Sequence, residues 1–82
     1  MKAYFVFLME ETGPEHEMEI VSERFLKAFN SKEKAISYVE KYANGKIDPE
    51  RGMLILSKSR FKVLGEKHER IKYLSIAKIE IE

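Results

Sequence analysis

Residues 3–9 form an unbroken apolar run that contains three aromatic rings. Because successive side chains of a β-strand point to opposite faces, a strand formed by this run is apolar on both faces. One face carries Tyr4, Val6 and Leu8, and the other carries Ala3, Phe5, Phe7 and Met9. This pattern is typical of a strand in the middle of a sheet that is covered on both sides. Residues 2–10 are therefore predicted to form a central strand.

Three further segments have the composition of strands. Residues 18–28 alternate at first, and the alternation breaks after Glu23, which predicts a bulge or bend near Arg24. The polar residues 11–17 contain Gly13-Pro14 and are predicted to be a loop that joins the first two strands into an antiparallel hairpin. Residues 60–65 and 70–81 also alternate, with a predicted turn at 65–69 between them.

One amphipathic helix is predicted over residues 31–43. Its apolar stripe consists of Ala35, Ile36, Val39, Tyr42 and Ala43. Either Asn30 or Ser31 has the side-chain oxygen that an N-cap requires, and Asn44-Gly45 is typical of a left-handed helix end. Residues 46–52 are rich in turn formers, and the short apolar run 53–56 is compatible with either a strand or a helix.

The order of these elements predicts one α+β domain over residues 1–82. An antiparallel sheet of about four strands with one main helix on one face is the simplest arrangement of strand–strand–helix–strand–strand. Four strands make a sheet some 15–20 Å wide, whereas a helix is about 10 Å across. The helix leaves the second face bare, so either residues 46–56 or a second copy of the chain is expected to cover it. Phe5, Phe7 and Met9 are the residues predicted to lie at such an interface.

Composition narrows the class of protein. The 82 residues include no cysteine, which excludes disulfides and thiolate chemistry. No segment has the length of a membrane span and the N-terminus lacks a signal-peptide pattern, so a cytoplasmic location is expected. The many Lys and Glu residues indicate either a thermophilic source or an AT-rich genome.

Charge is unevenly distributed although the net charge is only +1. Residues 1–23 carry one lysine against six glutamates, a net charge of −5, and the remainder carries +6. These two parts can attract each other within one fold or between two copies. The strongest basic concentration lies within residues 57–72, where a phosphate-binding ribbon is predicted to consist of Lys58, Arg60, Lys62, Arg70 and Lys72.

Catalytic and metal-binding patterns are missing from the sequence. His16 and His68 are each flanked by glutamates, but neither has a recognised ligand spacing or an evident orienting partner. The serines do not form a nucleophile elbow, and the glycines match no phosphate-binding loop. We therefore expect a protein that is not an enzyme and that has no cofactor or metal.

The segment Phe29-Asn-Ser-Lys-Glu-Lys-Ala35 follows an N-terminal aromatic strand. In this it resembles small uncharacterised prokaryotic and phage-associated α+β domains, in which a strand hairpin precedes a Phe-x-Ser-x-Glu-x-Ala helix. The matching residues are Phe29, Ser31, Glu33 and Ala35. The resemblance implies a fold but no activity and no site.

Two functions follow as expectations from these patterns. The first is a small protein-interaction module that binds a further copy of itself, or another protein, through a sheet face. The alternative is a nucleic-acid-binding protein that uses the basic segment 57–72. No membrane partner is expected.

Overall fold

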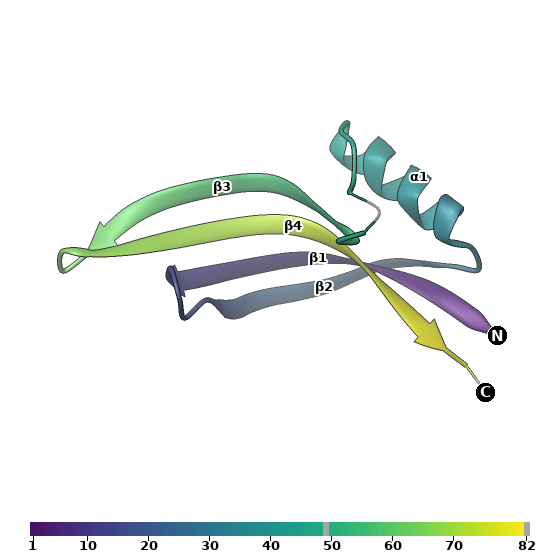
Figure 1. Cartoon of the computed structure of the whole chain (residues 1–82), viewed down its shortest axis with the longest axis horizontal. Helices are drawn as coiled ribbons and strands as arrows, with labels where there is room; N and C mark the ends of the chain where they lie inside the picture. Colours follow the sequence, from purple (N-terminus) through teal and green to yellow (C-terminus); the bar gives the residue numbers. More distant parts are fainter. Residues whose placement is uncertain (49, 82) are drawn as a thin grey trace.

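The chain folds into one antiparallel sheet with a single helix, as shown by a computed structural model that describes residues 1–48 and 50–81 (Figure 1). Its elements, in chain order, are β1 (Lys2–Pro14), β2 (Glu19–Phe29), α1 (Lys32–Ala43), β3 (Met53–Val63) and β4 (Glu66–Glu80). The predicted fold class and element order are confirmed. Pro49, within the predicted turn 46–52, lies outside the described residues.

The strand order in the sheet is β2-β1-β4-β3. β1 pairs with β4 along its whole length, from Lys2 opposite Glu80 to Pro14 opposite His68. The apolar run 3–9 therefore lies in a central strand, as predicted. The two chain ends are neighbours, because the backbone N–H of Ile81 donates to the carbonyl of Met1 at 2.7 Å. β2 and β3 form the two edges.

The strands are longer than their sequence patterns indicated. β1 continues to Pro14 through part of the predicted loop 11–17, and β4 begins at Glu66, within the predicted turn 65–69. The β3–β4 turn consists only of Leu64 and Gly65, whose φ angles of 50° and 83° match a type I′ hairpin. The runs 53–56 and 60–65 belong mainly to one continuous strand, because pairing with β4 satisfies the backbone groups of the residues between them.

Bulges interrupt both edge strands. In β2 the register shifts at Leu26 and again at Val21, so the bulge predicted near Arg24 exists two residues away. In β3 it shifts at Leu56. Because side chains alternate with a period of two, each extra residue exchanges the faces of everything beyond it. These bulges decide which edge-strand side chains meet.

The helix begins and ends with local signals. Ser31 is the N-cap, and its hydroxyl accepts from the backbone N–H of Lys34 at 3.2 Å. Of the two candidate caps, Ser31 and not Asn30 therefore serves. Asn44 ends the helix with a φ of 52°, the left-handed conformation that the Asn-Gly pair indicated.

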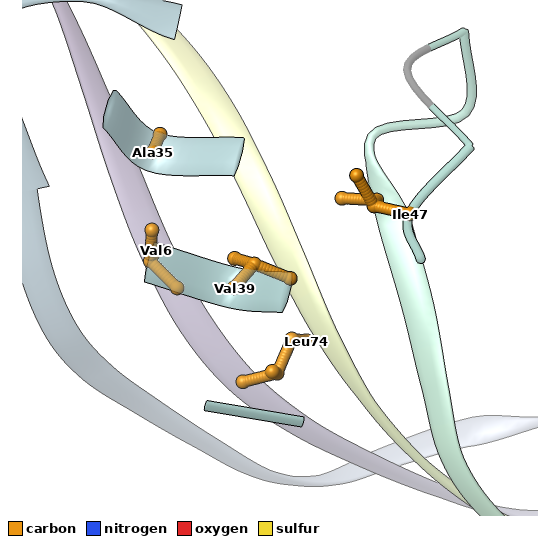
Figure 2. Packing of buried hydrophobic residues seen from close by; sticks show 5 residues of the cluster. All are labelled: Val6, Ala35, Val39, Ile47 and Leu74. Atoms are coloured by element: carbon orange, nitrogen blue, oxygen red, sulfur yellow. The ribbon is translucent and has the colours of Figure 1, made fainter. Parts of the chain in front are cut away.

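The core lies between the helix and one face of the sheet (Figure 2). Val6 of β1 and Leu74 of β4 are fully buried against Ala35 and Val39 of α1. Ile47 closes the same core, and its backbone N–H donates to Glu40 Oε2 at 3.0 Å. The turn after the helix therefore covers the helix side of the sheet. Of the predicted alternatives for residues 46–56, cover of the second face is therefore not what the described residues 46–48 and 50–56 provide: Ile47 packs on the helix side, and Met53–Leu56 belong to β3.

Candidate protein interface

The open face is the face of the sheet that points away from α1. Val6 and Leu74 point toward the helix, so their neighbours along each strand point to the open face. Directly opposite residues of paired strands share a face, and the strand pairing therefore gives the remaining members of this face. Its central apolar members are Ala3, Phe5, Phe7, Met9, Phe25, Ala28, Met53, Ile55, Ile71, Tyr73, Ala77 and Ile79. No other element of the described chain lies on this side of the sheet (Figure 1). Four strands thus present a broad apolar surface.

Three phenylalanines form a cluster on the open face. The ring of Phe25 lies 5.5 Å from that of Phe5 and 5.8 Å from that of Phe7, both edge to face, and the rings of Phe5 and Phe7 are 6.4 Å apart. Such geometry is attractive for aromatic pairs. The sequence identified Phe5 and Phe7, but Phe25 was missed because the bulge at Leu26 determines which way it points.

Burial differs between the centre and the edges of the open face. Met9 is only 8% exposed, so the neighbouring side chains of the same face enclose it. Phe25 on β2 and Ile55 on β3 are 53% and 52% exposed. The structure therefore places the predicted interface residues Phe5, Phe7 and Met9 together, with the more exposed apolar side chains to either side. A covering partner would gain most by contacting the edges.

Tyr73 links the apolar region of the open face to its acidic part. Its hydroxyl donates to Oε2 of Glu11. Burial, then this hydrogen bond, then the charges of Glu11 and Glu23 raise the pKa of Tyr73 from 10.0 to about 12. Each of these causes disfavours the charged phenolate form of Tyr73. Two acidic groups therefore lie close to one another on β1 and β2.

Basic residues lie at the opposite edge of the same face. Glu69 of β4 is 7% exposed, and its Oε1 accepts from Nε of Arg60 at 3.2 Å. Nζ of Lys58 lies 3.7 Å from its Oε2. Glu69 thus neutralises part of the charge on β3, and the stems of both cations shield it from solvent. Lys62 pairs with Lys67 near the hairpin tip, which leaves this edge positive.

The register separates the five basic residues that the sequence assigned to one ribbon. Lys58, Arg60 and Lys62 pair with Ile71, Glu69 and Lys67 and so lie on the open face. Arg70 and Lys72 pair with Ser59 and Ser57 on the helix side. The expected single basic surface is wrong, because the bulge at Leu56 turns the outer part of β3 over relative to β4.

The two histidines lie near the hairpin ends. His16 is exposed in the β1–β2 turn. His68 stacks near Phe61, with ring centres 5.6 Å apart, and its Nε2 is 3.9 Å from Glu66 Oε2. Within residues 1–48 and 50–81 no group of three or more His, Cys, Asp or Glu side chains is arranged to hold a metal ion.

Comparison with protein-family models, with curated proteins and with solved structures finds no match. The resemblance to phage-associated domains accordingly stays a prediction. Among the described residues, no helix has the length and apolar character needed to cross a membrane.

Proposed function

We propose that the protein is a non-enzymatic interaction module that self-associates through its open face. One observation carries this proposal: four strands present a cluster of aromatic and aliphatic side chains with no cover on the described chain. Contiguous apolar patches of this kind on small proteins are typical of interaction sites. The same face holds Phe5, Phe7 and Met9.

The surface area supports a partner of considerable size. A folded monomer of 9.6 kDa has an accessible surface of about 5,100 Å² by the usual scaling with mass. This chain exposes 6141 Å². The excess of about 1,000 Å² is similar to the roughly 800 Å² that each partner buries in a standard interface. The radius of gyration of 14.4 Å likewise exceeds the roughly 12 Å of a compact chain of this length.

A second copy of the chain is the occupant that the charges favour. The N-terminal part is acidic and the remainder is basic, so two copies can pair opposite charges where one copy cannot bring them together. On the open face Glu11 and Glu23 lie on β1 and β2, while Lys58 and Lys62 lie on β3. A sheet face that is acidic on the side of β1 and β2 and basic on the side of β3 is suited to bind a second copy of itself.

The alternative, nucleic-acid binding, has less support from the geometry. A phosphate-binding ribbon needs its cations on one surface, whereas Arg70 and Lys72 lie on the face opposite Lys58. Glu69 also places a carboxylate beside Arg60. Self-association needs only the cations of β3, such as Lys58 and Lys62, which share the open face.

Sedimentation equilibrium over a range of protein concentrations tests the proposal. We expect the wild-type chain to dimerise, and Phe25→Ser to raise the dimer dissociation constant at least tenfold. Tyr42→Ser is the matched control, because Tyr42 is a 52% exposed aromatic on α1, away from the open face. A wild-type chain that stays monomeric at high micromolar concentration would overturn the proposal. An equal effect of both variants would show that the contact lies elsewhere.

A further inference from the structure

We infer that two copies pack face to face about a twofold axis that runs along the strands, so that β2 of each copy lies over β3 of the other. This inference rests on the proposed self-association and adds the arrangement of the partner. It assigns Glu23 and Lys58 as an intermolecular charge pair, in addition to the ion pair that Lys58 makes with Glu69 within one chain.

The open face has an acidic half and a basic half. Glu11 of β1 and Glu23 of β2 form the acidic half, and both raise the pKa of the neighbouring Tyr73. Lys58, Arg60 and Lys62 of β3 form the basic half, where Glu69 balances one of the three charges. Because the strand order is β2-β1-β4-β3, these halves lie toward opposite edges of one sheet (Figure 1).

The strand register places Glu11 and Lys58 in one row across the sheet and Glu23 in the neighbouring row. One row across the open face consists of Ile20, Glu11, Ile71 and Lys58. The next row consists of Glu23, Met9, Tyr73 and Ile55. In these two rows the acidic residues Glu11 and Glu23 therefore lie on β1 and β2, and the basic residue Lys58 lies on β3.

A twofold axis along the strands reverses each row over itself. Lys58 of one copy then lies over Ile20 of the other copy. In that other copy, Glu11 is the next residue in the same row as Ile20, and Glu23 lies in the neighbouring row. Neighbouring rows are only about 7 Å apart, which a lysine side chain spans. Phe7 of one copy then lies opposite Ser75 of the other, so the apolar centres of the two open faces are in contact. Packed sheets tolerate this alignment, with strands about 30° apart.

The other face-to-face arrangement has its axis across the strands. It superposes β2 on β2 and moves the charged rows over the opposite end of the sheet, where Ala3 and Ile79 lie. Glu23 would then be desolvated without a cationic partner and Lys58 would keep only Glu69, which is unfavourable. Joining the chains edge to edge through β3 would set lysines and arginines against their own copies. Of these three arrangements, only the axis along the strands pairs opposite charges.

Charge reversal in separate chains tests this arrangement. Glu23→Lys and Lys58→Glu should each raise the homodimer dissociation constant about tenfold or more at low salt. An equimolar mixture of the two variants should form a heterodimer within about threefold of wild-type affinity, because the reversed charges meet once more. Glu19→Lys and Arg70→Glu are the matched controls: both are exposed strand residues on the helix side, and their mixture should behave as wild type.

A second measurement needs no change on the open face. A nitroxide on Ser57→Cys, which lies on β3 and on the helix side, is mixed with unlabelled ¹⁵N protein. We expect the β2 amides of the unlabelled copy to broaden most. The arrangement would be overturned if the β3 amides broadened most, or if mixing the two variants failed to restore affinity. Dimerisation of the wild type would still support the proposed function in either case. A monomeric wild type would overturn both.

Discussion

The two faces of the sheet have the same kind of residues and very different surroundings. On the helix side Val6 and Leu74 are completely buried by α1 and by Ile47. On the open face Phe25 and Ile55, from strands of the same sheet, keep about half of their surface exposed. The difference shows that hydrophobic composition alone does not make a core, since a second layer must supply the cover. The following predictions test how the two faces differ and whether a second copy covers the open face.

The largest effect is expected at the covered face. Leu74→Ala should lower the free energy of unfolding by about 3–5 kcal/mol, because it removes a fully buried side chain and leaves a cavity beneath the helix. Denaturant titration should give the same loss at low and high protein concentration. A loss below about 1 kcal/mol would contradict the assignment of this face as the core.

The open face should respond in a way that depends on concentration. Phe7→Ala should cost about 2 kcal/mol or more in the dimer, as truncation of a central interface aromatic does. The measurement is chemical denaturation at several protein concentrations, with Phe5→Ala as a parallel variant. A cost below about 1 kcal/mol for both, at every concentration, would show that the open face stays exposed to solvent.

The helix that makes the two faces different depends on its N-cap. Ser31→Ala removes the acceptor for the backbone N–H of Lys34 and should lower the stability by about 1 kcal/mol. Ser31→Asp is the control, because aspartate also caps and should retain most of the stability. Thermal unfolding followed by circular dichroism measures both. An equal loss for the two variants would argue against capping as the cause.

The smallest effect concerns alkaline pH. Because the pKa of Tyr73 is raised to about 12 in the folded state, the neutral phenol favours folding at pH values below 10. That contribution is lost as the pH rises from about 10 to about 12, since the unfolded chain releases the proton first. Tyr73→Phe should flatten this part of the stability curve relative to wild type. Thermal unfolding at pH 8 and pH 11 gives the comparison, and an unchanged slope would contradict it.

Local signals in the sequence were sufficient for the helix and for the central strand. The seven-residue apolar run predicts a strand that is central, because only there can both of its faces find cover. Ser31 and Asn44 mark the helix ends through their own backbone preferences. Strand lengths were underestimated because pairing with a neighbour extends a strand through Pro14 and from Glu66, where the residues alone resemble turns.

The candidate site was predictable only in part. Phe5, Phe7 and Met9 share a face by simple alternation within one strand, and the structure keeps them together. Phe25 joins them through pairing with Phe7, which no local pattern shows. The basic residues were assigned to one surface because a regular strand would put them there. The bulge at Leu56 reverses the faces to which the following residues of β3 point, so Lys58 and Arg70 lie on opposite faces.

The sequence by itself determined the class of fold, the two-faced central strand and the helix that covers one face. These depend on the periodicity and the backbone preferences of neighbouring residues, which act over a few positions. The tertiary structure alone decided the strand order, the side covered by Ile47 and the face on which each charged residue of β2 and β3 lies. Those features depend on pairing between distant segments, where a single bulged residue reverses every side chain beyond it.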